Sequence, residues 1–360
     1  MDSNSSNNFQ IEILKQIAKE KKDTNLLISP ISIFLALALT AHGAKGKTLE
    51  EMLKVINSGK SIEDLDKYTK EVLSVLEKSK SIQVANAVLT KVKPTDTFTD
   101  SCKSFNALID KLVSVEQVNG WCKEKTNGKI PTILDSISDI EMCILNAVYF
   151  LGKWETAFNP KEIHELAFVK DSGEEQKVPM MSALFNDAQY YEDEKMQLML
   201  LPYTEIGVTG VLMLPDRKIK IDDFIAELKN DYLIHALQYT ETRKVSLTVP
   251  KFKIESEMKC KDVLMNLGMT TPFGDTADFS DITKETALKI SDVTHKTFID
   301  VNEEGTEAAA VTKVGMFRMM MPNPKDIPVR FLCNRPFLFS VCNFDMKDMF
   351  LFMAKIATLK

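Results

Sequence analysis

The side chains that could catalyse a reaction or bind a metal are scattered along this sequence. His42, His164 and His235 lie far apart and show none of the short spacings that hold a metal ion. The chain carries no GxSxG, HExxH, P-loop or paired-carboxylate signature. We therefore expect no metal site and no cofactor, and we do not expect an enzyme.

The six cysteines show no paired spacing. In a chain of 360 residues this usage indicates buried free thiols in a reducing compartment rather than a disulfide framework. They are Cys102, Cys122, Cys143, Cys260, Cys333 and Cys342.

The most unusual stretch spans residues 303–328. Its second half holds Pro322, Pro324 and Pro328, which neither a regular helix nor a central strand accepts. We therefore expect an exposed loop. An exposed apolar stretch indicates a ligand for another molecule. This loop would display such a stretch, made of Met316, Phe317, Met319, Met320 and Met321.

The first half of the same stretch alternates with a period of two. Between residues 306 and 317 the two charged side chains, Glu307 and Lys313, both lie at odd-numbered positions. Such alternation predicts a strand with one face able to enter a core. An ordinary helix-to-strand connection is the alternative, because three consecutive alanines also favour a helix. The small and apolar parity consists of Thr306, Ala308, Ala310, Thr312, Val314 and Met316.

Composition narrows the class of protein. The chain is 44 % hydrophobic and 27 % charged, with a net charge of −6 and no long run of one sign, which argues against a nucleic-acid partner. No apolar run approaches the roughly 20 residues that span a bilayer, so we expect no membrane partner. The first residues show neither a basic nor an apolar signal region, which predicts a cytoplasmic protein. Release by a signal-independent route stays open.

The hydrophobic pattern predicts a mixed α+β fold with large sheets. Helical periodicity marks residues 9–21, 31–43, 48 onward and 61–78, with Ser29 placed to cap the second helix and Pro30 in its first turn. Strand-like runs occupy residues 82–89, 142–150, 245–255 and 288–300, with a helix near 261–267 between the last two. Short apolar segments separated by glycine and prolines indicate a β-rich region at residues 165–215. We find no linker, so residues 1–360 are expected to form one domain.

Ordered motifs along nearly the whole chain resemble the serpin family. Residues 25–33 resemble the segment that opens the helix behind the main sheet of that family, residues 85–86 and 145–154 its second and third main-sheet strands, and residues 301–310 its inhibitory hinge. Residues 105–121 are short by comparison. Further matches, in order, are residues 126–130, 178–181, 201–203, 250–255, 267–269, 277–280, 290–296 and 334–337.

The resemblance implies several helices packed on three β-sheets, with a reactive-centre loop at about residues 303–328. It also implies a suicide inhibitor of serine proteases. The target cleaves the loop and stays attached as an acyl-enzyme, while the cut strand inserts into the main sheet. The implied hinge consists of Glu303, Glu304, Gly305, Thr306, Glu307, Ala308, Ala309, Ala310, Val311 and Thr312.

The position of the reactive bond follows from the same resemblance. Counting about seventeen residues from Glu303 places it at Met319–Met320, which predicts a chymotrypsin-, elastase- or cathepsin G-like target. The alternative bond, Arg318–Met319, would suit a trypsin-like enzyme. Oxidation of Met319 would weaken the binding of this side chain by a chymotrypsin-, elastase- or cathepsin G-like target. A non-inhibitory serpin, acting as a chaperone or carrier, is the alternative function.

A hydrogen-bonded gate, or shutter, beneath the main sheet is also implied. It would consist of Ser29, Ser32, Asn146 and His295, with Trp154 at the breach where the loop enters the sheet. For His295 an ordinary buried histidine is the alternative. The lysines at residues 67–80 alternate with acidic residues and indicate a solvated helix face rather than a glycosaminoglycan site. We expect a monomer.

Overall fold

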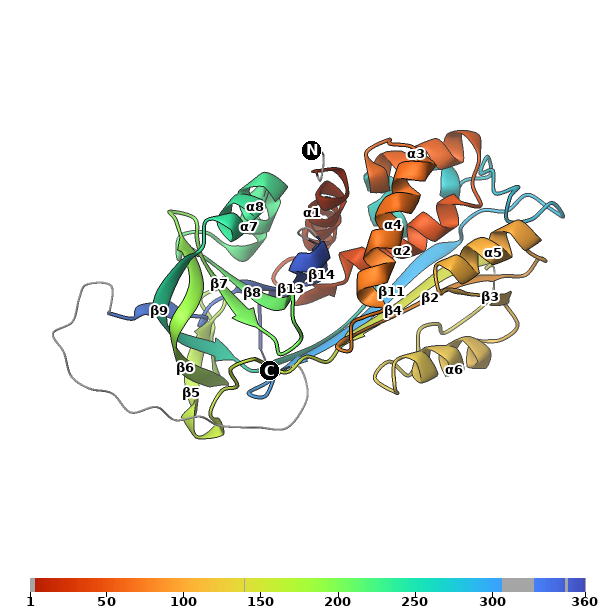
Figure 1. Ribbon diagram of the computed structural model, residues 1–360. Coiled ribbons are helices and arrows are strands. Elements are labelled where there is room, and N and C mark those ends of the chain that lie inside the picture. Colours follow the sequence, from red (N-terminus) through yellow and green to blue (C-terminus); the bar gives the residue numbers. More distant parts are fainter. Residues whose placement is uncertain (1–3, 139, 306–326, 347–348, 360) are drawn as a thin grey trace.

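A computed structural model describes residues 4–138, 140–305, 327–346 and 349–359 of the chain. Within these ranges, helices surround two β-sheets (Figure 1). None of the described helices is long and apolar enough to cross a membrane. The helices are α1 (Asn4–Glu20), α2 (Pro30–Ala41), α3 (Gly46–Asn57), α4 (Ile62–Leu76), α5 (Asp96–Ser104), α6 (Val115–Lys125), α7 (Ile221–Glu227), α8 (Asn230–Gln238) and α9 (Lys261–Asn266).

The strands fall into a sheet of five and a sheet of nine. They are β1 (Leu26–Ile28), β2 (Ile82–Thr90), β3 (Leu108–Lys111), β4 (Met142–Phe150), β5 (Ile163–Val169), β6 (Glu175–Glu192), β7 (Met196–Pro202), β8 (Val208–Pro215), β9 (Glu241–Pro250), β10 (Phe252–Lys259), β11 (Asp292–Val301), β12 (Val329–Leu332), β13 (Phe337–Asn343) and β14 (Met349–Ile356).

The five-stranded sheet carries the candidate site. Its strands follow the order β10-β11-β4-β2-β3. The pairs β10–β11 and β4–β2 are antiparallel, whereas the central pair β11–β4 is parallel. All nine residues of β4 are buried. A strand covered on both faces is expected to be a continuous apolar run, as this one is.

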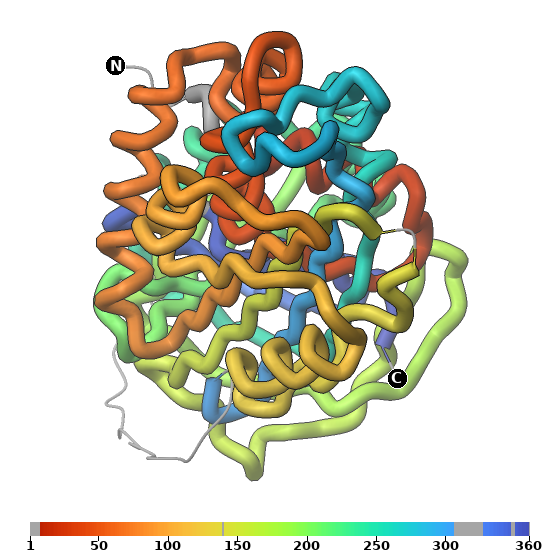
Figure 2. Tube along the Cα trace, turned by 90° about the vertical axis from the view of Figure 1, so that its right-hand side faces the viewer, coloured from red at the N-terminus to blue at the C-terminus, as the bar shows by residue number. Residues whose placement is uncertain are grey.

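Different layers cover the two faces of this sheet. Helix α2, all of whose residues are buried, packs on one face. Helix α6 covers the other face and is the gold coil at the lower front of Figure 2. Val118 of α6 and Ile133 of the segment that follows it belong to one apolar cluster with Leu145 of β4 and Phe298 of β11. The central strands are therefore enclosed from both sides.

The nine-stranded sheet follows the order β1-β14-β13-β8-β7-β6-β9-β12, and β5 also pairs with β6. Strand β6 spans 18 residues and shifts its register with β9 between Phe185 and Ala188. Because β6 pairs with strands on both sides of this shift, its hydrogen bonds join two of the three expected sheets into one.

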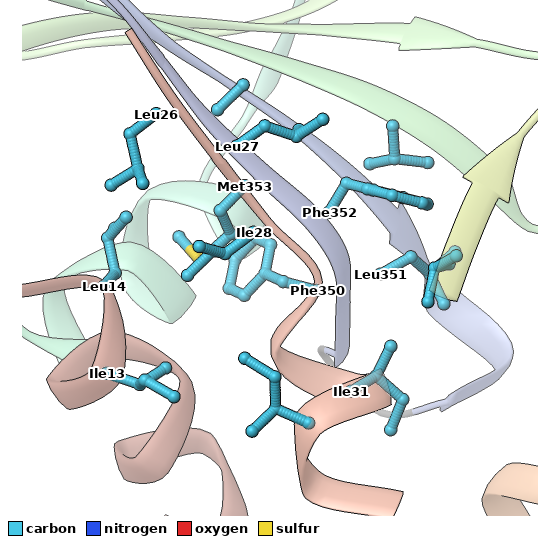
Figure 3. Close-up of a cluster of buried hydrophobic side chains, with 14 of the residues drawn as sticks. Ile13, Leu14, Leu26, Leu27, Ile28, Ile31, Phe350, Leu351, Phe352 and Met353 are labelled. Atoms are coloured by element: carbon cyan, nitrogen blue, oxygen red, sulfur yellow. The ribbon is translucent and has the colours of Figure 1, made fainter. Parts of the chain in front are cut away.

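The core of the nine-stranded sheet is packed by the first part of the chain. Figure 3 shows Ile13 and Leu14 of α1 and Ile28 of β1 beside Phe350 and Met353 of β14. Strand β1 pairs with β14 through Leu26, Leu27 and Ile28. This pairing connects the two ends of the chain and fixes the start of α2 beneath the five-stranded sheet.

The predicted elements are found with shifted ends. The helix expected from residue 9 begins at Asn4, the one expected from residue 48 begins at Gly46, and residues 61–78 hold the single helix α4. Despite the short stretch before it, α6 begins at Val115. One expectation was wrong: Ser29 occupies the N-cap position of α2, but its hydroxyl makes no capping hydrogen bond.

Candidate functional site

The centre of the candidate site is the seam between β11 and β4. The two strands pair directly from Asp292 opposite Cys143 to Phe298 opposite Tyr149. Both strands run toward the same end of the sheet, where β11 continues into residues 302–305. A chain that turned back at this end would run antiparallel to both strands.

Residues 302–305 form such a turn. The Asn302 N–H donates to the Gly305 carbonyl at 2.9 Å, and the Gly305 N–H donates back to the Asn302 carbonyl at 3.3 Å. The Asn302 side chain accepts a further bond from the Glu304 N–H at 3.0 Å. This reciprocal pair closes a two-residue hairpin connection, with Glu303 and Glu304 at its tip.

Gly305 also pairs with the β4 side of the seam, through an antiparallel bridge to Lys153. Its φ is +143°, and an added Cβ would lie 2.2 Å from the Gly152 carbonyl oxygen and 2.6 Å from the Lys153 Cα. Any side chain would therefore collide with backbone atoms. Gly305 therefore sits between the end of β11 and the end of β4, hydrogen-bonded to Asn302 and bridged to Lys153.

Trp154 holds this turn in place. Its indole N–H donates to the Asn302 carbonyl at 3.0 Å, and its backbone N–H donates to the Glu304 carbonyl at 3.1 Å. The indole is buried and stacks on Tyr203, with 4.2 Å between the ring centroids. Trp154 therefore lies at the end of the sheet where residues 302–305 turn, and its role at the breach stays a prediction.

Glu303 anchors the other side of the turn. Its carboxylate lies 2.5 Å from the Lys251 ammonium, and its carbonyl accepts a bond from the Phe158 N–H at 2.8 Å. Burial alone would raise the pKa of Glu303, but the hydrogen bond from Lys251, a backbone N–H and the charge of Lys251 together hold that pKa below its ordinary value. Nothing in the sequence pattern pointed to Lys251.

The predicted gate residues meet below the middle of the seam. The Ser29 backbone N–H donates to His295 Nε2 at 3.0 Å, and His295 Nδ1 lies 2.7 Å from Asn146 Oδ1. Because a backbone N–H can only donate, Nε2 accepts and the ring proton is on Nδ1. His295 is fully buried, and this burial lowers its pKa to about 3, so the ring is neutral.

Ser32 and Asn86 complete this network. The Ser32 hydroxyl donates to Asn146 Oδ1, and Asn146 Nδ2 donates to the Ser32 carbonyl at 3.1 Å and to Asn86 Oδ1 at 2.5 Å. Ser29 takes part through its backbone, while its buried hydroxyl has no partner among the described residues. Sequence reasoning missed Asn86 as a gate residue, although Asn86-Ala-Val repeats the Asn146-Ala-Val of the neighbouring strand.

A strap behind α6 covers the outer face of the seam. Asn119 of α6 accepts bonds from the Ile133 N–H at 2.7 Å and the Leu134 N–H at 3.0 Å, and donates to the Leu134 carbonyl at 2.8 Å. Lys296 of β11 lies beneath this layer, 2.9 Å from Glu257. The strap, residues 129–138, therefore rests on the face that an added strand would disturb.

Part of the expected site lies outside the described residues. This applies to the hinge beyond Gly305 and to both candidate reactive bonds. Among the residues that are described, no group of three His, Cys, Asp or Glu side chains could hold a metal ion. The affected residues are Thr306, Glu307, Ala308, Ala309, Ala310, Val311, Thr312, Arg318, Met319 and Met320.

Comparison with known proteins identifies the class to which this fold and seam belong. Residues 4–359 match the family Serpin (serine protease inhibitor). Serpin B6 of Pongo abelii is 33 % identical over 369 residues, covering 92 % of this chain and 93 % of that protein. The chain therefore belongs to the serpin family.

Other relatives agree with this assignment. Alpha-1-antichymotrypsin of Homo sapiens is 30 % identical over 370 residues, covering 98 % of this chain and 86 % of that protein. The crystal structure of the thermophilic serpin tengpin in its native state superposes with a TM-score of 0.91 at 34 % identity, covering 100 % of this chain and 95 % of that one.

Proposed function

We propose that this serpin inhibits serine proteases by offering its loop as a substrate and then inserting the cleaved strand between β11 and β4. The observation that carries the proposal is the turn at Asn302 and Gly305. Gly305 pairs with Asn302 on one flank and with Lys153 on the other. The first residue of an inserted strand is thus in place before any cleavage, and no catalytic group of this chain is needed.

The register of this turn supports the proposal. Continuing the pairing of Gly305 one residue at a time would bring Thr306 opposite Val301 and Gly152, and Ala308 opposite Ile299 and Phe150. The β11 residues of that parity face the α2 side of the sheet, as the bonds of His295 and Thr297 to the segment around β1 and α2 show. The small and apolar parity of the loop would therefore enter the core.

Thr312 would arrive at the gate in the same register. It would lie opposite both His295 and Asn146, which pair with each other in the closed sheet. A threonine hydroxyl can donate and accept, so it can replace the direct bond between these two side chains. An apolar residue at this point would leave the buried His295 Nδ1–H without a partner, which costs about 1–3 kcal/mol, whereas Asn146 Oδ1 would keep its bond from the Ser32 hydroxyl.

The relatives support the choice of target. The name of the relative alpha-1-antichymotrypsin refers to chymotrypsin, and Met319 suits the apolar specificity pocket of such an enzyme. We therefore propose Met319–Met320 as the reactive bond and a chymotrypsin-, elastase- or cathepsin G-like protease as the partner. Arg318–Met319, with a trypsin-like partner, is the second candidate because Arg318 precedes Met319 directly.

The test is to mix the protein with chymotrypsin and, separately, with trypsin. We expect an SDS-stable complex with chymotrypsin and a released fragment that begins at Met320. Met319→Ala should weaken this inhibition, whereas the adjacent Arg318→Ala should leave it intact. A fragment that begins at Met319 would transfer the assignment to trypsin-like targets. A cut protein that melts at the same temperature as the intact one, and releases its attacker active, would indicate a non-inhibitory serpin.

Several expectations from the sequence remain predictions. These are a single domain, a monomeric state and a cytoplasmic location, with release by a signal-independent route still open. It also remains a prediction that the protein has no nucleic-acid partner and no glycosaminoglycan site.

A further inference from the structure

The arginines of this chain are concentrated at one place. Of the 45 Lys and Arg residues, five are arginines. Three of these five, Arg217, Arg330 and Arg335, line a single cavity of about 240 Å³. The cavity lies where β7 and β8 meet β12, the strand that follows the reactive-centre loop. In a chain that otherwise uses lysine for positive charge, this clustering requires an explanation.

Hydrogen bonds hold the Arg335 side chain in place at one side of the cavity. Its Nε and Nη2 atoms donate to the Pro215 carbonyl at 3.2 and 2.7 Å, which sets the plane of the guanidinium. Burial lowers the pKa of Arg335, and the nearby positive charge of Arg217 lowers it further. The exposed Arg217 therefore repels the half-buried Arg335, and Asp216 offsets only part of the lowering, so a bound anion would relieve this repulsion.

Three carboxylates line the cavity with the arginines, and each accepts a hydrogen bond from another donor. Asp193 accepts from the hydroxyls of Tyr191 and Tyr232 and from two backbone N–H groups, the Tyr190 hydroxyl donates to Glu192, and the Lys218 N–H donates to Asp216 at 3.0 Å. Within the part of the chain that the structure describes, none of the three arginines lies in an ion pair with a carboxylate. The guanidinium charges are therefore available to a ligand.

We propose that this cavity binds a tetrahedral oxyanion, a phosphate or sulfate group, either free or carried by a small ester. Arginine presents a planar fork of N–H donors that matches such oxygens, whereas lysine offers a point charge. The cavity is small compared with sites for drug-sized ligands, which span roughly 300–1,000 Å³. A single anionic group fits this description better than an extended ligand.

The position of Arg330 gives the bound anion a mechanical role. Arg330 lies on β12, which pairs with β9 over the four residues Val329–Leu332. Arg217 and Arg335 belong to the segments that follow β8 and β12. An anion that contacts Arg330 and these two arginines would add a bridge between β12 and the rest of the sheet. It would thereby hold the far end of the reactive-centre loop in place.

The binding test uses isothermal titration of the full chain with inorganic phosphate, and separately with glycerol 3-phosphate, at constant ionic strength. Acetate, which is planar rather than tetrahedral, serves as the control anion. We expect saturable binding of phosphate, with acetate at least about tenfold weaker. A stronger response to glycerol 3-phosphate than to phosphate would assign the site to an ester. Titrations that show no saturable binding of either phosphate compound would overturn the proposal.

Matched variants locate the site. Arg217→Ala and Arg330→Ala should each weaken phosphate binding by at least about tenfold. Lys218→Ala removes the same charge from the adjacent residue, which does not line the cavity, and should change binding less than about twofold. All three side chains are exposed, so the variants should fold. Equal losses in Arg217→Ala and Lys218→Ala would mean general charge attraction and would refute a defined site.

Hydrogen exchange gives a second readout that does not depend on protease inhibition. Saturating phosphate should slow exchange of the β12 amides at Val329–Leu332 in the wild type, and this slowing should be lost in Arg330→Ala. If phosphate binds but leaves β12 exchange unchanged, the bridging role is wrong. Because neither assay contains a protease, their failure would leave the proposed inhibition untouched.

Discussion

Lowering the pH from 7 to 5 is expected to destabilise the closed sheet through His295. Burial lowers the pKa of this histidine to about 3, whereas a histidine in the unfolded chain titrates near about 6.5. Between these values the unfolded chain binds a proton that the folded chain does not. The stability is therefore present above about pH 6.5 and is lost as the pH falls toward 3. At about 1.4 kcal/mol per pKa unit, the step from pH 7 to pH 5 costs about 2 kcal/mol.

The contacts of His295 explain why the cost falls on the seam. Its Nε2 accepts from the Ser29 N–H, so a second ring proton would place one donor against another. On the other side, Nδ1 faces the Asn146 amide oxygen, which is uncharged. Neither partner can compensate for a charged imidazole. Protonation therefore opens the contact that joins β11 to the start of α2.

The assay compares the free energy of unfolding by urea at pH 7 and pH 5 for the uncleaved wild type and for His295→Gln. Glutamine keeps a donor and an acceptor but does not titrate. The loss between the two pH values should be about 2 kcal/mol smaller in the variant. His164→Gln, whose wild-type side chain is 63 % exposed, is the control and should lose as much as the wild type. An equal loss in His295→Gln and the wild type would refute the reasoning.

Three further predictions concern the path of the loop. Thr306→Arg should convert the inhibitor into a substrate, because the side chain at residue 306 would be buried on insertion. Glu307→Arg, whose side chain would face the opposite side of the strand, should leave the stoichiometry of inhibition with chymotrypsin nearly unchanged. Similar stoichiometries for the two variants would contradict the register. Gly305→Val should raise the stoichiometry at least about twofold, because its Cβ would stand 2.2 Å from a backbone oxygen; a wild-type value would show that the turn can move. Asn119→Ala should free the strap from α6 by removing three hydrogen bonds, two of them to Leu134. The variant should therefore convert faster from the intact protein to a non-inhibitory form at elevated temperature. An unchanged rate would show that the strap does not limit insertion.

The sequence predicted the central strands because their patterns are local. The run at residues 142–150 is apolar throughout, as a strand buried on both faces must be. The gate could be named from the resemblance to a family, since Ser29, Ser32, Asn146 and His295 lie in separate motifs. Their convergence is a property of strand register, which brings His295 opposite Asn146. No pattern within one segment of the chain contains that information.

The entrance to the sheet was harder to foresee. Lys251 follows Pro250 at the end of a strand, far in sequence from Glu303, and nothing in its surroundings marks it as the partner of a hinge carboxylate. Asn302 looked like an ordinary residue before the hinge, yet it supplies four of the bonds that form the turn and fix it to Trp154. These contacts depend on where β10, β11 and the end of β4 meet, so they require the assembled sheet.

The geometry of the seam also explains why insertion would release free energy. Strands β11 and β4 are parallel, and a parallel ladder is slightly less stable per residue than an antiparallel one. A strand that continued from Gly305 would run antiparallel to both, so one parallel ladder would be exchanged for two antiparallel ladders. Each added hydrogen bond contributes about 0.5–1.5 kcal/mol net. In the proposed mechanism, this gain would be opposed in the intact chain by the contacts of His295, by the strap behind α6 and by the attachment of the loop to β12. Cleavage would remove the last of these alone, so a protease would trigger the change while the other two would set its rate.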